Sequence, residues 1–228
     1  SNDYFGKEYK AQYGKTYEED FESIYAVSLN RLAKIATYMD KSVYSKSLLD
    51  IGCALGFFCK AAKDFGFGDV EGLEISEYAA NYGKERFNIV VHITEFEEFI
   101  PVKKYDVITG WFVFEHFIDP FAMFCKVYEM LKDNGIFACT LPSYFGPLFY
   151  CHRNKWILSH PNDHRIDVTP WSIKKILRSI GFSFIACFPS GYHPERFGDI
   201  ARKYQKLYNL VADILCFSDT LLVIAKKS

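Results

Sequence analysis

The chain has 228 residues, of which 50% are hydrophobic and 24% are charged, a balance typical of a folded globular protein and not of a disordered one. With 27 basic and 28 acidic residues the formal net charge is −1, which argues against general binding of nucleic acid or of an anionic membrane. The chain begins with polar residues, and no uninterrupted apolar run reaches about 18 residues. These features argue against a membrane span and against secretion.

The seven cysteines are scattered and form no C-x-x-C motif. Most of them lie inside apolar runs, as reduced buried thiols do, so we predict a reducing compartment and a cytoplasmic location. Aromatic residues reach 18% of the chain. Such a share can fill a core, but it also suggests a ligand pocket with flat walls.

Residues 1–46 are predicted to form a helical lead-in, and residues 47–228 the main domain. Within the lead-in, Tyr9, Tyr13 and Tyr17 recur at helical spacing. A face of this kind usually packs into a core. In the alternative, Tyr4, Phe5, Tyr9 or Tyr13 forms a lid that closes over a ligand and excludes water. Both readings stay open from the sequence alone.

From residue 47 onward, short apolar runs alternate with amphipathic stretches of helical length. The runs cover residues 47–53, 70–75, 89–93, 105–111, 136–141, 182–188 and 221–225. Strands that are apolar throughout belong to a mostly parallel sheet with helices on both faces. The pattern therefore predicts a doubly wound, Rossmann-like α/β fold, whose ligand lies at the carboxyl ends of the strands.

The helices between these runs carry clear start and stop signals. One begins at Asp119-Pro120 and is expected to end at Asn134-Gly135. Another begins at Thr169-Pro170 and ends at Gly181. Residues 196–217 are predicted to form one further helix.

The first run is followed by a turn of small residues that leads into a helix. Backbone in such a turn can approach a ligand closely, and the helix start offers free N–H groups. Asp50 places a carboxylate at this turn, which would attract an ammonium group and repel a pyrophosphate. Three residues separate Gly52 from Gly56, so the dinucleotide fingerprint G-x-G-x-x-G is not present.

The second run ends in Glu74, a carboxylate that can accept hydrogen bonds from both hydroxyls of a ribose. Ile75 beside it offers an apolar plate for an adenine ring. Together with Asp50 on the preceding strand, these residues favour a nucleoside ligand over a solvent-exposed strand end.

Four motifs in this order resemble the class I S-adenosylmethionine-dependent methyltransferases, in particular a bacterial small-molecule branch with a Glu-His pair before Asp-Pro. The motifs are LDIGCALG at 49–56, GLEIS at 72–76, YDVI at 105–108 and VFEHFIDP at 113–120. The similarity extends from about residue 46 to residue 181. It implies a seven-stranded sheet whose last strand is antiparallel, and S-adenosyl-L-methionine as cofactor.

The same resemblance implies a set of cofactor-binding residues. They are Asp50, Gly52, Cys53, Ala54 and Gly56 for the methionine half, Glu74 for the ribose, Ile75, Thr94, Glu95 and Phe96 around the adenine, and Gly110 and Trp111 near the methionine amino group and sulfonium. Ala54 departs from the family, which usually has glycine there, and this puts the backbone dihedral at that position in question.

A small-molecule acceptor is expected to contact the lead-in and an insertion at about 143–168. A sugar, a quinone precursor or a secondary metabolite would fit, and the sequence leaves open whether oxygen, nitrogen or carbon is methylated. His116 and His164 are the candidate general bases. A metal site drawn from Cys151, His152, His160, Asp163 and His164 is conceivable, but Pro161 interrupts helical spacing and we expect no metal.

Two other functions remain as alternatives. A nicotinamide-linked oxidoreductase would share the fold, although Asp50 and the missing middle glycine count against it. A cofactor-binding module without catalytic activity is suggested only by Ala54. The oligomeric state cannot be read from the sequence.

Overall fold

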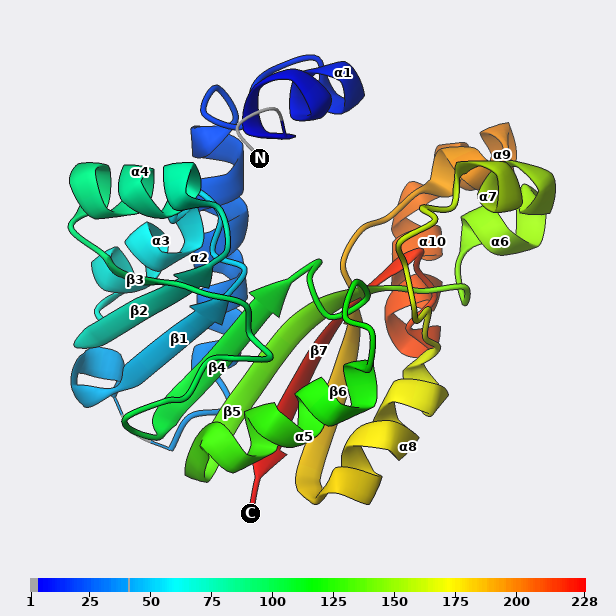
Figure 1. The fold of residues 1–228 in the computed structure, drawn as a ribbon. Helices are drawn as coiled ribbons and strands as arrows, with labels where there is room; N and C mark the ends of the chain where they lie inside the picture. Colours follow the sequence, from blue (N-terminus) through cyan, green and yellow to red (C-terminus); the bar gives the residue numbers. More distant parts are fainter. Residues whose placement is uncertain (1–3, 41) are drawn as a thin grey trace. The chain divides into compact units, whose positions relative to one another are not determined.

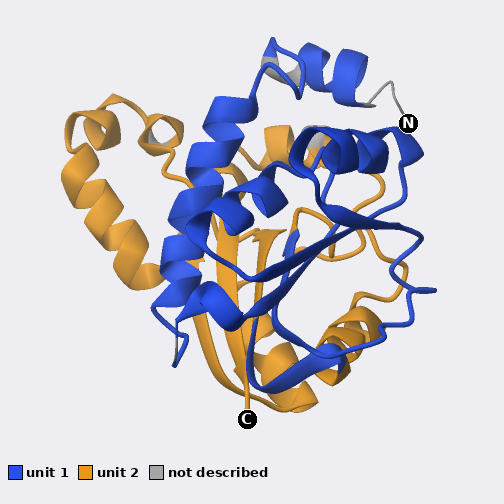
Figure 2. Cartoon of the chain, turned by 90° about the vertical axis from the view of Figure 1, so that its left-hand side faces the viewer, with its two compact units in different colours: residues 1–110, 130–136 blue, residues 111–129, 137–228 orange. Residues whose placement is uncertain are grey.

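The computed structural model describes residues 4–40 and 42–228. The side chains of Tyr4 and Tyr13 lie outside the described part of the chain, so the lid prediction rests on Phe5 and Tyr9. The chain forms two compact units, which are coloured separately in Figure 2. Unit 1 comprises residues 1–110 and 130–136, and unit 2 comprises residues 111–129 and 137–228.

The strands form one seven-stranded sheet in the order β3-β2-β1-β4-β5-β7-β6 (Figure 1). The strands are β1 Ser47–Ile51, β2 Asp69–Glu74, β3 Val90–Ile93, β4 Tyr105–Trp111, β5 Leu131–Pro142, β6 Phe182–Pro189 and β7 Thr220–Lys227. The β1–β2, β1–β4 and β2–β3 pairs are parallel, whereas β6 and β7 are antiparallel. The predicted α/β class and the antiparallel last strand are confirmed.

Three helices of unit 1 pack on one another and on its strands. They are α2 Phe21–Ala36, α3 Phe57–Phe65 and α4 Glu77–Phe87. Helix α3 contacts α2, β1 and β2, and helix α4 contacts β2 and β3 (Figure 1). All five residues of β1 are buried, because a central parallel strand is covered on both faces.

The lead-in differs from a single helix. It starts with a π-helical turn, Tyr4–Glu8, and the short helix α1, Tyr9–Tyr13, which ends at Gly14 with a φ of 78°. A left-handed residue at this position stops the helix, so Tyr17 is not on the same helical face as Tyr9. The expected i, i+4, i+8 face of tyrosines is therefore wrong. A 3₁₀ turn at Val43–Ser45 precedes β1.

Unit 2 carries the remaining helices. They are α5 Pro120–Met130, α6 Pro147–Cys151, α7 Arg153–Ser159, α8 Pro170–Ile180, a 3₁₀ turn at Pro194–Phe197, α9 Asp199–Lys203 and α10 Gln205–Leu215, the last residue of α5 being counted with unit 1. Helix α8 begins at the predicted signal, since Thr169 and Ser172 form a capping box. The insertion at 143–168 contains α6 and α7.

Two predicted helix limits are wrong. Helix α5 ends at Met130, and strand β5 already begins at Leu131, ahead of Asn134, whose φ is 60°. The helix expected over residues 196–217 is interrupted, because Gly198 has a φ of 92° that no α-helix accommodates. A second break lies at Tyr204.

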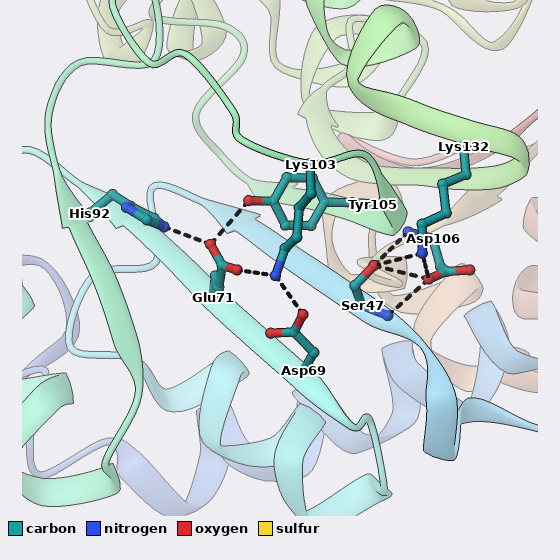
Figure 3. Close-up of polar contacts among 8 residues, drawn as sticks. All are labelled: Ser47, Asp69, Glu71, His92, Lys103, Tyr105, Asp106 and Lys132. Carbon is teal, nitrogen blue, oxygen red and sulfur yellow. Dashed lines mark hydrogen bonds and ion pairs between the residues drawn. The ribbon is translucent and has the colours of Figure 1, made fainter.

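Two polar clusters join the strands of unit 1 (Figure 3). In the first, Glu71 accepts hydrogen bonds from Tyr105 at 3.0 Å and pairs with His92 at 2.6 Å and with Lys103. In the second, the Asp106 carboxylate accepts a hydrogen bond from Lys132 at 2.6 Å and two more from the backbone N–H and the hydroxyl of Ser47. Burial alone would raise the pKa of Asp106, but the hydrogen bonds from Lys132 and Ser47 hold that pKa well below its usual range.

No helix within residues 4–40 and 42–228 is both long enough and apolar enough to cross a membrane.

Candidate functional site

The turn between β1 and α3 has an alternating backbone in which every second residue is left-handed. The φ angles are 68° at Gly52, 50° at Ala54 and 81° at Gly56. The backbone N–H groups of Gly52 and Cys53 donate to the carbonyl of Leu73 at 2.8 and 3.0 Å. These two bonds fix the start of the turn to the adjacent strand β2.

Ala54 has a φ of 50°, a left-handed conformation that glycine adopts more readily than alanine. Its Cβ makes this conformation less favourable by roughly 1–2 kcal/mol than the right-handed one. The backbone N–H of Ala54 donates to Glu74 Oε2 at 2.9 Å, which helps to hold the residue in place. The alanine therefore preserves the shape of the turn at some cost in stability.

Glu74 lies at the end of β2 with both carboxylate oxygens engaged. Oε2 accepts from Ala54, and Oε1 accepts from the backbone N–H of Ser76 at 2.8 Å. Each carboxylate oxygen has a second lone pair, so a pair of hydroxyls can still bind. Ile75, the next residue, has 69% of its surface exposed and is free to cover a flat ring.

Asp50 lies within β1 and is only 1% exposed. Its Oδ1 accepts a hydrogen bond from the Thr109 hydroxyl at 2.6 Å, and the Cys59 thiol lies 4.0 Å from its Oδ2. Burial raises the pKa of Asp50 to about 7, although Thr109 and Arg31 act in the opposite direction. The carboxylate is thus enclosed by protein and does not lie at an open mouth of the turn.

Arg31 and Thr109 are missing from the sequence-based set. Arg31 lies in helix α2, where burial lowers its pKa to about 10 and the charge of Asp50 partly restores it. Thr109 is the residue of β4 that is in register with Asp50. Thr109 could have been noticed as a polar residue within an apolar strand. No local feature of the sequence marked Arg31.

The residues predicted around the adenine differ in their exposure. Thr94, which follows β3, is half-buried and Glu95 is exposed, whereas Phe96 is only 2% exposed. The ring of Phe96 therefore belongs to the core, and this position can serve a ligand only through its backbone. Gly110 is buried at the end of unit 1, and Trp111 is the first residue of unit 2.

The lead-in packs on the turn that follows β1. Phe5 is 6% exposed and belongs to a buried cluster with Leu55 and Phe57. Tyr17 stacks on Phe57 with ring centroids 5.3 Å apart, and its backbone N–H donates to the Phe5 carbonyl at 3.0 Å. Tyr9 is also buried and donates its hydroxyl to Asp20 at 2.7 Å. The aromatic residues of the lead-in thus support the turn from outside.

A second cluster of ionisable side chains lies in unit 2 and brings the two predicted histidines together. The rings of His116 and His164 are edge to face with centroids 4.9 Å apart. His116 Nδ1 pairs with Asp163 at 3.0 Å. The backbone N–H of Arg165 donates to the Glu115 carbonyl at 2.6 Å, which ties the two chain segments together.

Two groups of this cluster have shifted pKa values. Burial raises the pKa of Glu115 to about 7, and the carboxylates of Asp167 and Asp163 add to the shift. Burial lowers the pKa of His164 to about 4, and the nearby His116 acts in the same direction. Of the other residues considered for a metal, His160 lies beside His164, with ring centroids 5.2 Å apart, and Cys151 is exposed.

The model of one protein family, described as a methyltransferase domain, matches residues 17–186. Among characterised proteins, malonyl-[acyl-carrier protein] O-methyltransferase 1 of Ilyobacter polytropus is 28% identical over 110 residues. That alignment covers 46% of this chain, and it spans 41% of the length of the relative.

Several solved structures have a similar fold. A SAM-dependent methyltransferase from Archaeoglobus fulgidus matches with a TM-score of 0.66 at 22% identity, covering 92% of this chain and 98% of the other. A SAM-dependent methyltransferase from Thermotoga maritima, described as a possible histamine N-methyltransferase, matches with a TM-score of 0.64 at 15% identity. The match covers 93% of this chain and 94% of the other. The magnesium protoporphyrin IX methyltransferase of Synechocystis, with bound SAM, matches with a TM-score of 0.56 at 14% identity. The match covers 88% of this chain and 79% of the other. The chain belongs to the methyltransferase-domain family and has the fold of S-adenosylmethionine-dependent methyltransferases.

Proposed function

We propose that this protein transfers a methyl group from S-adenosyl-L-methionine to a small-molecule acceptor. The observation that carries the proposal is the position of Glu74, whose two oxygens are held by the N–H groups of Ala54 and Ser76 beside a turn of left-handed residues. Glu74 thus offers a carboxylate that can accept hydrogen bonds from ribose hydroxyls, beside a turn that a ligand can approach closely. Membership of the methyltransferase-domain family supports the same chemistry.

Each residue of unit 1 has a proposed task at this site. Glu74 binds the ribose hydroxyls, and the exposed Ile75 covers the adenine, with Thr94 and Glu95 at its edge. The turn over 52–56, with Cys53 and Ala54, binds the methionine half, and Gly110, which is in register with Ile51 of β1, is proposed to lie near the methionine amino group. The role predicted for Trp111, the first residue of unit 2, stays a prediction. When bound, S-adenosylmethionine supplies an electrophilic methyl group on sulfur.

Asp50 keeps the task expected from the sequence, but it would act from an enclosed position. Because its carboxylate is enclosed and accepts a hydrogen bond from Thr109, we propose that Asp50 positions the turn and that its ionised form would attract the methionine ammonium. Holding the reacting groups at near-attack distance can supply on the order of 7–11 kcal/mol of the barrier reduction. The chain then needs no nucleophile of its own.

The acceptor is proposed to be a small molecule with a hydroxyl, such as a sugar, a quinone precursor or a secondary metabolite. The similar proteins described above have different named acceptors, namely malonyl-[acyl-carrier protein], magnesium protoporphyrin IX and, as a possibility, histamine, so they do not single out one acceptor. His116 or His164 is the proposed general base. Asp163 on Nδ1 of His116 would fix the tautomer in which Nε2 accepts a proton.

Calorimetric titration with S-adenosylhomocysteine tests the cofactor assignment. We expect the wild-type protein to bind it, Glu74→Gln to bind about 10–100-fold more weakly because a charged hydrogen-bond acceptor is lost, and the exposed Glu98→Gln to bind as the wild type does. A melting curve of each variant shows whether the turn still folds.

The alternatives give different results in the same experiment. Binding of NADH or NADPH in place of S-adenosylhomocysteine would support an oxidoreductase, and unchanged affinity in Glu74→Gln would contradict the site. Transfer of a labelled methyl group to a panel of hydroxyl acceptors then tests catalysis. Tight cofactor binding without transfer to any member would favour a non-catalytic module.

A further inference from the structure

We propose that Glu115, His116 and His164 of unit 2 form a binding site for a divalent transition-metal ion. One carboxylate oxygen and one nitrogen from each imidazole lie within 4.8 Å of one another. All three residues belong to unit 2, and none of them is among the residues that unit 1 offers to the cofactor. The metal site does not depend on the cofactor site of unit 1, but it replaces the general-base role proposed above for His116 or His164, since a ring nitrogen that binds an ion cannot also accept a proton.

The strongest argument is a buried carboxylate oxygen with nothing to bind. Glu115 is 1% exposed, and its Oε2 has no hydrogen-bond partner among the described residues. Leaving a buried acceptor unsatisfied costs about 1–3 kcal/mol, and more if the group is charged. A cation at this oxygen would remove that cost.

His164 has the same deficiency at the same place. Its Nδ1 is buried and also has no partner within the described part of the chain. The two unsatisfied groups come from segments far apart in the sequence, and the hydrogen bond from the Arg165 N–H to the Glu115 carbonyl holds them together. One ion would satisfy both groups at once.

The third ligand is oriented as metal-binding histidines usually are. Asp163 Oδ2 lies 3.0 Å from His116 Nδ1, which leaves the other ring nitrogen for an ion. Such a carboxylate fixes the ring and raises the basicity of the ligand. A similar pair, His160 with Asp167 at 3.2 Å, flanks His164.

The donor set selects the class of metal. Two imidazoles and one carboxylate suit Zn²⁺, Fe²⁺ or Co²⁺, whereas Mg²⁺ and Ca²⁺ prefer oxygen ligands. Bonds of about 2.0–2.1 Å require the donors to move closer together, which the exposed His116 can do by rotating. The exposed side of His116 also gives the ion an entry path and leaves a coordination position for water or a ligand oxygen.

Titration of the metal-free, untagged protein with ZnCl₂ tests the site, with CoCl₂ absorption as a spectroscopic readout of imidazole ligation. We expect one Zn²⁺ per chain. Affinity should fall by more than about 100-fold in His116→Ala and Glu115→Gln, and by about 10-fold in Asp163→Asn, which removes only the orienting carboxylate. His116 is exposed, so its variant will fold, and circular dichroism verifies this.

His193→Ala is the matched control, because His193 is an exposed histidine of unit 2 that pairs with Glu195 at 3.0 Å. It should bind Zn²⁺ as the wild type does. The proposal is overturned if the wild type binds Mg²⁺ but not Zn²⁺, or binds neither. It is also overturned if His116→Ala retains full affinity, and loss in His160→Ala alone would assign the ion to His160, His164 and Asp167 instead.

Discussion

The buried carboxylates at the candidate site of unit 1 and the buried carboxylate of the histidine cluster in unit 2 differ in their hydrogen bonds. In unit 1, Asp50, Glu71 and Glu74 are nearly inaccessible, and each accepts hydrogen bonds from other parts of the unit. In unit 2, Glu115 is as deeply buried, but its Oε2 has no partner among the described residues, and Nδ1 of His164 has none either. The hydrogen bonds to the carboxylates of unit 1 stabilise the fold, whereas Glu115 and His164 each keep a buried atom that can still bind a partner.

This difference separates two kinds of functional residue. Glu74 is already held in position, so a ligand adds bonds to a site that exists without it. Glu115 Oε2 and His164 Nδ1 have no partner among the described residues, so an ion bound there, as proposed above, would satisfy both. Measurements on matched variants can break or sharpen this comparison.

The largest effect is expected from Asp50→Asn. The pKa of Asp50 is about 7 in the folded chain against an ordinary value of 3.8, so between these values the folded state holds a proton that the unfolded state has lost. The stability that the protonated Asp50 carboxyl provides is complete below pH 3.8, decreases as the pH rises above 3.8, and is lost once the pH has passed 7. At pH 8 the variant should be more stable than the wild type by on the order of 3 kcal/mol.

Urea melts of both proteins from pH 4 to pH 8 check this expectation. The difference between the two stability curves should grow up to about pH 7 and then become constant. The exposed Asp133→Asn serves as the control and should show no such trend. A constant difference for Asp50→Asn would show that the carboxylate is ionised throughout.

Glu71→Gln and Glu115→Gln form the pair that compares the units directly. Glu71→Gln removes the partner of Lys103 and His92 and should cost about 2–3 kcal/mol of unfolding free energy. Glu115→Gln alters a carboxylate whose Oε2 has no partner within residues 4–40 and 42–228, so metal-free protein should lose nothing or gain up to about 1 kcal/mol. Denaturation in EDTA at pH 8 measures both, and equal losses would contradict the distinction.

The smallest effect concerns Ala54→Gly. Glycine relieves the left-handed backbone at φ 50° but adds freedom to the unfolded chain. We expect a net gain of about 0.5–1 kcal/mol and an unchanged affinity for S-adenosylhomocysteine, because the N–H bond to Glu74 remains. A thermal melt and a calorimetric titration check the two parts. Weaker binding would show that the methyl group itself contacts the ligand.

Local signals predicted much of the fold. Apolar runs located all seven strands, and Thr169-Pro170 located the start of α8. The errors occurred where backbone conformation overrides side-chain pattern. Gly14 ends α1 before Tyr17, and Gly198 divides the helix that the apolar spacing over 196–217 suggested.

The candidate site was predicted unevenly. The position of Glu74 at the end of β2 follows from the sequence, since the strand and its end are local features. The enclosure of Asp50 does not, because it depends on Thr109, 59 residues away, and on Arg31 of another helix. Phe96 was chosen for its place after a strand, yet packing turned its ring into the core.

The sequence by itself located the seven strands approximately and the start of α8, because those preferences arise from neighbours a few residues apart. It also marked the turn and the acid that go with a nucleoside ligand. Only the tertiary structure decided which polar groups are satisfied. Pairing of Glu115 with His164 depends on two distant segments meeting, and no local pattern encodes whether a buried oxygen finds a donor there.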